Sequence, residues 1–162
     1  MPETSTPDGS SSIRKTSEED RQTERYRELI SKFERSPYAQ LMGTRIVELS
    51  EGYVKVSMTV QESHLNFAGL LHGGVTMSLA DEAFACATNT LNGLYVAVQF
   101  NMNFFATAKP GDELVAECRV IHAGRSLGVA EMTVADSSGK LIARATGTVA
   151  NVRRDGVPPS SP

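Results

Sequence analysis

Two neighbouring carboxylates, Asp81 and Glu82, lie in the middle of an otherwise apolar stretch of the sequence. The stretch runs from about Gly73 to Leu91, and its lack of a polar stripe is typical of a helix that is buried on all sides. A carboxylate buried there without partners costs on the order of several kcal/mol. At least one of the two acids therefore has a structural partner or a chemical task.

The same stretch begins at His72-Gly73-Gly74, where a helix start is expected. Glycines at a helix start let a ligand approach bare backbone N–H groups, and the helix dipole adds partial positive charge. Such donors can stabilise an oxyanion that forms during a reaction. These three residues alone also fit an ordinary flexible turn.

The distance between the glycines at the helix start and Asp81 decides whether both can act in one reaction. Asp81 comes seven residues after Gly74, which returns it to nearly the same helix face. At about 1.5 Å per residue, the two lie roughly 10 Å apart along the axis. One small reacting group cannot easily touch both, so a joint reaction would take its second group from a partner subunit with an antiparallel helix. Glu82 points about 100° away round the helix, and the residues alone do not choose between the two acids.

The remaining segments predict one helix before this stretch and strands on either side of it. Residues 17–36 combine a capping Ser17, first-turn acids and helical spacing, and Pro37 is expected to end that helix. Alternating patterns predict strands at about 44–50, 53–60, 95–105, 113–122, 126–136 and 140–152. The third of these is expected to turn Val96, Val98, Phe100, Met102 and Phe104 to one face.

The order of these elements favours an α+β fold in which a curved antiparallel sheet wraps round the central helix. Such a sheet covers one side of the helix, so a second subunit is expected on the other side. We expect residues 1–16 and 155–162 to be disordered tails, and residues 17–154 to form one domain.

Composition excludes several classes of protein. The net charge of -3 over 162 residues argues against nucleic acid as a partner, and no run approaches the roughly 20 apolar residues of a membrane span. Cys86 and Cys118, in apolar surroundings, indicate reduced thiols and a cytoplasmic protein. The three histidines have no partners at metal-ligand spacing, so no metal is expected.

Taken together, several motifs resemble the hotdog-fold thioesterases, and most closely the PaaI-like acyl-CoA thioesterases of phenylacetate degradation. The resemblance covers about residues 34–153. It rests on Asn66, His72-Gly73-Gly74, the run from Ser78 to Phe84, Lys109-Pro-Gly-Asp112, His122-Ala-Gly-Arg125 and the order of strands.

The resemblance implies hydrolysis of an acyl-CoA substrate without metal or cofactor, in a homodimer or homotetramer. Asp81 would be the catalytic carboxylate, as general base or nucleophile, and the Gly73 N–H would polarise the thioester carbonyl. His72 would assist there or hold the loop, and Asn66 would orient the water or the thioester. Substrate-binding roles would fall to Gly74, Gln99, Arg125 and Ser126, with Arg125 near the CoA phosphates.

One position departs from the family pattern. Some relatives carry a Ser or Thr that helps to position the water where this chain has Ala97; Thr76, Gln99 or Asn101 would replace it, or the assistance is absent. Arg153-Arg154 are a second candidate for phosphate binding. Phe67, Phe104 and Phe105 fit either an acyl pocket or the core.

Two other functions stay open at this point. Ala97 leaves room for a non-catalytic protein that binds or senses acyl-CoA. A hydratase or dehydratase on the same fold would use Glu82 in place of Asp81. The sequence does not fix the acyl group, the choice between dimer and tetramer, or the role of Asp81 as base or nucleophile.

Overall fold

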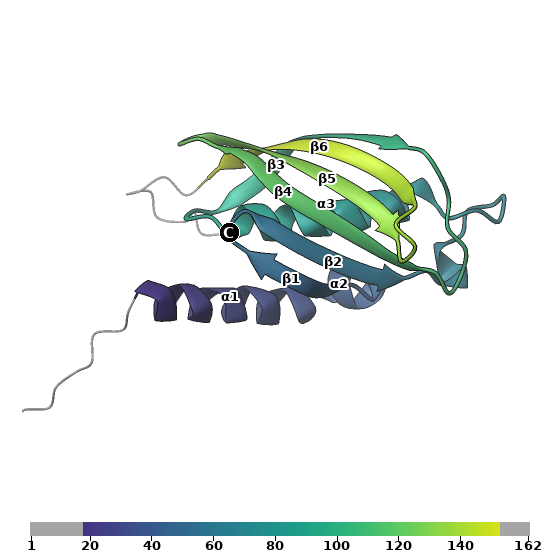
Figure 1. The fold of residues 1–162 in the computed structure, drawn as a ribbon, viewed down its shortest axis with the longest axis horizontal. Coiled ribbons are helices and arrows are strands. Elements are labelled where there is room, and N and C mark those ends of the chain that lie inside the picture. Colours follow the sequence, from purple (N-terminus) through teal and green to yellow (C-terminus); the bar gives the residue numbers. More distant parts are fainter. Residues whose placement is uncertain (1–17, 153–162) are drawn as a thin grey trace, which may run out of the picture.

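A computed structural model describes residues 18–152, in which an antiparallel sheet curves round one long helix (Figure 1). The strands are β1 (Arg45–Ser50), β2 (Tyr53–Thr59), β3 (Tyr95–Phe104), β4 (Glu113–Ala123), β5 (Leu127–Asp136) and β6 (Leu141–Asn151). Their order across the sheet is β1-β2-β4-β5-β6-β3, so β1 and β3 form the two edges. The expected α+β architecture, a hotdog fold, is confirmed.

The central helix α3 (Gly73–Asn89) carries the core. Its buried residues face the concave side of the sheet: Thr76, Leu79, Ala80, Ala83, Phe84, Cys86, Ala87 and Thr88. The Phe84 ring meets Phe100 of β3 edge-on, with centroids 5.9 Å apart. It also fills the space above Gly147 of β6, where an added Cβ would come within 2.6 Å of the ring. Glycine at 147 therefore lets the helix approach the sheet.

One face of α3 is not covered by the sheet, as expected for a single chain, and its burial by a second subunit stays a prediction. Gly74, Met77, Asp81 and Ala85 lie on this uncovered face, and Met77 is 40% exposed. Their spacing of three, four and four residues is that of a single helical stripe. Helical spacing in the sequence had placed Gly74 and Asp81 on one face, and the structure adds Met77 and Ala85 to it.

Strand β3 is an exposed edge with an irregular register. A bulge between Ala97 and Gln99 breaks its pairing with β6. A bulge adds one residue and shifts the alternation of side chains. Val96 and Val98 therefore do not share the core face with Phe100 and Met102, as the alternation had predicted, and Val98 is 58% exposed.

Two helices precede the sheet where one was predicted. Helix α1 (Glu18–Glu34) starts with three acids, and α2 (Pro37–Met42) follows after a short turn. Pro37 does not simply end a helix: it occupies the first turn of α2, where its missing N–H has no cost, and Ser36 caps that helix. Arg25 of α1 donates to the carbonyls of Leu91 and Asn89 at the end of α3.

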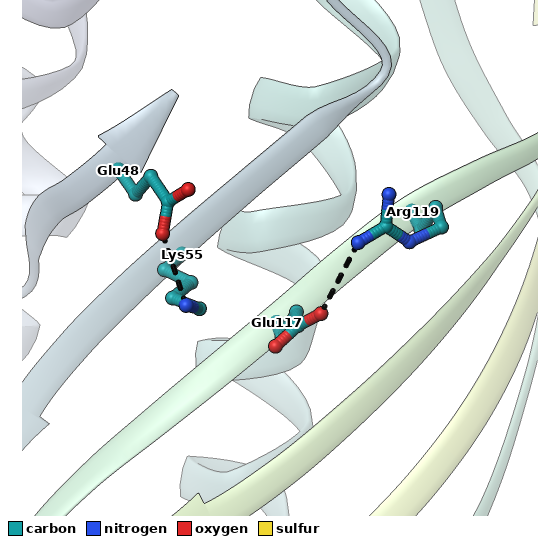
Figure 2. Close-up of polar contacts among 4 residues, drawn as sticks. All are labelled: Glu48, Lys55, Glu117 and Arg119. Atoms are coloured by element: carbon teal, nitrogen blue, oxygen red, sulfur yellow. Dashed lines mark hydrogen bonds and ion pairs between the residues drawn. The ribbon is translucent and has the colours of Figure 1, made fainter. Parts of the chain in front are cut away.

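The outer face of the sheet carries paired charges over β1, β2 and β4 (Figure 2). Lys55 bonds to Glu48 at 2.9 Å, and Arg119 approaches Glu117 at 3.6 Å. The Arg119 guanidinium also lies 4.4 Å from the centre of the Tyr53 ring. These pairs give the outer face of the sheet a polar character.

No helix within residues 18–152 is long and apolar enough to cross a membrane. The predicted tails, Ser17 and Arg153-Arg154 lie outside the described residues. The predicted limits of the domain, residues 17 and 154, therefore stay predictions.

Candidate active site

The first turn of α3 presents one free backbone donor. His72 caps the helix, and its Nδ1 accepts the Gly74 N–H at 2.9 Å. The His72 carbonyl accepts the N–H groups of Val75 and Thr76. Among residues 18–152, no acceptor bonds to the Gly73 N–H. A donor left open at a positive helix end is suited to bind a carbonyl oxygen or an oxyanion.

An aromatic side chain lies beside this donor. A Cβ added to Gly73 would lie 3.4 Å from Cζ of Phe104, at the end of β3, and the Phe104 side chain is half exposed. Gly74 has less room, since its Cβ would lie 3.0 Å from the His72 Nδ1. Gly73 is thus bordered by a ring, whereas Gly74 makes space for the capping imidazole.

Replacing His72 with alanine is expected to lower the free energy of unfolding by about 1 kcal/mol, because the helix loses a side-chain cap. Asparagine, which also caps helices well, should restore most of that stability. Chemical unfolding of both variants measures the effect. Equal stability of His72→Ala and the wild type would show that the imidazole does not act as a cap.

Asp81 lies on the uncovered face of α3, two turns beyond Gly74, as the spacing predicted. Its side chain is exposed in the single chain, and no hydrogen bond joins it to another group among residues 18–152. Eight residues separate it from Gly73, which corresponds to roughly 12 Å along the axis. The Gly73 N–H and the Asp81 carboxylate therefore lie on the same side of α3 but are too far apart to act on one reacting atom.

Desolvation by the surrounding chain raises the pKa of the Asp81 carboxyl. If Asp81 acts in its ionised form, activity is present above this raised pKa and is lost as pH falls through it. We therefore expect the acid limb of a kcat/KM profile to lie above the usual range of an aspartate. A profile that stays flat into that range would contradict the role of Asp81.

Glu82 turns away from the uncovered face toward the start of β1. Desolvation and the charge of Asp81 raise the pKa of the Glu82 carboxyl, and a hydrogen bond with Thr44 opposes the shift. Its Oε2 is buried without a partner within the described part of the chain. Glu82 is therefore less accessible to a substrate than Asp81, which favours Asp81 as the reactive acid.

Asn66 shapes the loop that leads into α3. Its Oδ1 accepts the N–H groups of Ala68 at 2.9 Å and Leu70 at 3.1 Å, and its backbone bonds to Leu70 and Gly69. The amide nitrogen has no partner among residues 18–152 and can still donate. The loop also exposes Phe67 fully.

The predicted CoA-binding residues do not meet Gly73 within one chain. Arg125 and Ser126 precede Leu127, which pairs with Ala150, and Ala150 pairs with Val96 near the start of β3. Gly73 lies beside Phe104 at the other end of β3, a strand roughly 30 Å long, since a Cβ added at Gly73 would touch the Phe104 ring. Gln99 lies between, where its Oε1 accepts from Thr148 at 3.5 Å.

The three side chains considered as replacements at the Ala97 position are buried, bonded to another side chain or on the outer face of the sheet. Thr76 is buried in the core, and Gln99 bonds to Thr148. Asn101 is paired with Thr146 and lies on the outer face of the sheet, opposite to Phe100 and Met102. A hydroxyl pair that the sequence did not suggest lies about one helical turn before Asp81. Tyr38 Oη and Ser78 Oγ lie 2.6 Å apart.

Sequence reasoning missed this pair. Ser78 stands three residues before Asp81, a spacing that would have placed it beside the acid. Tyr38 gave no signal, because its helix begins at Pro37, where a helix was expected to end.

No three His, Cys, Asp or Glu side chains gather in the arrangement of a metal site within residues 18–152. The expectation that the site uses no metal or cofactor stays a prediction.

The comparison with known proteins supports this fold. Residues 68–143 match the model of the thioesterase superfamily. The chain is 43% identical over 122 residues to a putative esterase of Archaeoglobus fulgidus, covering 75% of this chain and 79% of that protein. It is 34% identical over 111 residues to the acyl-coenzyme A thioesterase PaaI of Escherichia coli, covering 68% and 79%.

Two solved structures extend the comparison. The structure of the E. coli PaaI protein superposes with a TM-score of 0.77 at 30% identity, over 82% of this chain and 96% of that chain. A Streptococcus mutans protein solved with bound acetyl CoA gives a TM-score of 0.66 at 28% identity, over 68% and 90%. The chain belongs to the thioesterase superfamily, as a PaaI-like member with the hotdog fold.

Proposed function

We propose that this protein hydrolyses acyl-CoA thioesters to a carboxylic acid and CoA. The observation that carries the proposal is the open Gly73 N–H on a helix whose uncovered face also presents the free carboxylate of Asp81. An N–H donor and an ionised carboxylate are the two groups that thioester hydrolysis needs. The E. coli relative named as an acyl-CoA thioesterase supports the choice of substrate.

In the proposed mechanism, the thioester carbonyl oxygen accepts the Gly73 N–H, and the helix dipole stabilises the negative charge that develops on it. Asp81 takes a proton from water as that water attacks the carbonyl carbon, or Asp81 attacks that carbon itself to form a mixed anhydride that water then hydrolyses to the free acid. The tetrahedral centre then expels the CoA thiolate, which receives a proton. The free amide nitrogen of Asn66 is placed in the loop before Gly73 to hold the thioester.

The site of this proposal is built from two copies of the chain. A reacting carbon has to lie roughly 3 Å from both the donor and the acid, which the roughly 12 Å within one helix does not allow. An antiparallel second helix brings Asp81 of one copy level with Gly73 of the other. It would also bring the distant Arg125 of one copy toward the Gly73 end of the other, which suits its predicted contact with CoA phosphates.

The uncovered surface favours such a partner. Gly74, Ser78 and Ala85 are small and permit close approach of a second helix. The adjacent edge strand β3 has an unpaired side and exposes Val96 and Val98. Free edges with apolar side chains are prone to pair with another chain. The assembly is at least a dimer, and a tetramer of two such dimers is compatible with it.

The proposal includes a cytoplasmic location. It is supported by Cys86 and Cys118, which are both free and buried.

A hydrolysis screen tests the function. The purified protein is supplied with short-chain, long-chain and aromatic acyl-CoAs, and released CoA is measured with a thiol-reactive dye. We expect saturable thiol release for at least one class, with kcat in the usual range of about 1–10³ s⁻¹. Saturable binding of every ester without thiol release would reject the enzyme and favour a binding protein.

A further inference from the structure

A pair of hydroxyl groups lies at the border between α2 and α3, about one helical turn before Asp81. Tyr38 comes from α2 and Ser78 from α3, and their oxygens are 2.6 Å apart. The pair is held by a well-anchored element, since Ser36 caps α2 and both Ala39 and Met42 of that helix are buried. The Tyr38 side chain is nevertheless 47% exposed, so its hydroxyl is not sealed inside the core.

The position of Ser78 on the helix brings the pair close to the reactive acid. Side chains three residues apart on a helix have Cβ atoms about 5–6 Å from each other. A single water molecule can therefore bridge the Ser78 hydroxyl and the Asp81 carboxylate, with an ordinary hydrogen bond to each.

One of the two hydroxyl hydrogens of Tyr38 and Ser78 remains free to donate to another group. Each hydroxyl carries one hydrogen and two acceptor sites, and the bond between Tyr38 and Ser78 uses only one of the two hydrogens. Whichever oxygen donates, the other keeps a hydrogen for a third group. No further hydrogen bond engages either hydroxyl among residues 18–152.

We propose that Tyr38 and Ser78 position the attacking water beside Asp81. Ser78 would bind the water, and Tyr38 would fix the Ser78 hydroxyl in the required rotamer. This inference rests on the proposed hydrolysis at Asp81. Tyr38 lies outside residues 68–143, so the match to the model of the thioesterase superfamily does not include it.

The test uses Tyr38→Phe, Ser78→Ala and the double variant, each of which removes a hydroxyl and little else. We expect each single variant to lower kcat about tenfold, as the loss of one well-placed hydrogen bond does, with KM changed less than about twofold. The double variant should be about as slow as the singles, because the pair acts as a unit. Tyr26→Phe is the matched control, since the Tyr26 hydroxyl also bonds to a side chain, Gln22, but on α1.

A competing nucleophile separates water positioning from a general distortion of the site. Hydroxylamine converts the thioester to a hydroxamic acid and releases CoA as the thiol, without using the bound water. After subtraction of the reaction without enzyme, we expect the variants to form more hydroxamate relative to free acid than the wild type. A structural role for the hydroxyls would slow both products equally.

Three results would overturn the inference: wild-type kcat in Tyr38→Phe and Ser78→Ala, an equal loss in Tyr26→Phe, or an unchanged ratio of the two products. Asp81→Asn, measured in parallel, keeps the two proposals apart. If that variant is inactive while the hydroxyl variants are not, only the water-positioning role fails. If the wild type releases no thiol from any acyl-CoA, the proposed function itself fails.

Discussion

Replacing Asp81 with asparagine is expected to lower the turnover of acyl-CoA by about 10²- to 10⁴-fold, the range that a positioned general base supplies. The amide keeps the size of the side chain but cannot take a proton from water or attack the thioester carbon. Thiol release under saturating substrate measures the loss. Asp81→Ala should be similarly slow.

Asp81→Asn should fold normally. Desolvation raises the pKa of the Asp81 carboxyl, so its ionised form is less favourable in the folded chain than in the unfolded chain. The sign of this linkage means that the carboxyl opposes folding above its unfolded pKa and ceases to do so in acid. Asp81→Asn should therefore unfold at the same or a higher temperature than the wild type at neutral pH.

Glu82→Gln is the matched control, because it removes the neighbouring carboxylate, which is turned inward beside Thr44. Glu82→Gln should keep turnover within about threefold of the wild type, since Glu82 makes no contact with substrate in the proposed site. A large loss in Glu82→Gln with normal turnover in Asp81→Asn would reverse the assignment. It would point to the hydratase or dehydratase alternative.

The second large effect is expected from Gly73→Pro, which deletes the open N–H donor. Loss of one oxyanion donor costs about 10²- to 10³-fold in kcat. Proline is tolerated in the first turn of a helix, and the preceding residue must be extended. His72 already has φ of -66° and ψ of 127°, and the Gly73 N–H makes no bond within the described chain that proline would break.

Gly73→Ala isolates the donor from the added bulk. Its Cβ makes an ordinary contact of 3.4 Å with the Phe104 ring, and it keeps the N–H. Gly73→Ala should therefore retain much more activity than Gly73→Pro, while both unfold near the wild-type temperature. A folded Gly73→Pro protein with wild-type turnover would exclude the backbone donor from the mechanism.

Much of the fold could be predicted from periodicity. The alternation in β2 placed Val54, Val56 and Met58 on one face, and all three are buried. The apolar run of α3 gave the helix and its start, although it ends at Asn89 rather than Leu91. These features depend on local patterns that a window of sequence contains.

The errors had two sources: a local pattern that fits two structures, and strand pairing that a local pattern does not contain. Pro37 fits the stop of one helix and the start of the next equally well, and the Ser36 cap decided for a start. The bulge in β3 follows from pairing with β6, so the alternation of Val96 and Val98 could not reveal it.

The candidate site was predictable in part. Helical spacing placed Gly74 and Asp81 on one face, and the structure has both on the uncovered face of α3. Which acid faces outward depended on Thr44, which is distant in sequence, and so could not be read from two adjacent residues. Arg125 and Gly73 lie near opposite ends of β3. This separation depends on strand pairing between residues distant in sequence, so the motifs alone could not reveal it.

The shared site is tested most directly by combining two inactive variants in one dimer. Asp81→Asn and Gly73→Pro chains are co-expressed with different affinity tags, and the species carrying both tags is purified. One of its two sites then has an intact Gly73 from one chain and an intact Asp81 from the other. We predict thiol release at about half the wild-type rate from this mixed dimer, while each parent stays inactive. A mixed dimer as inactive as its parents would contradict a site built from two subunits.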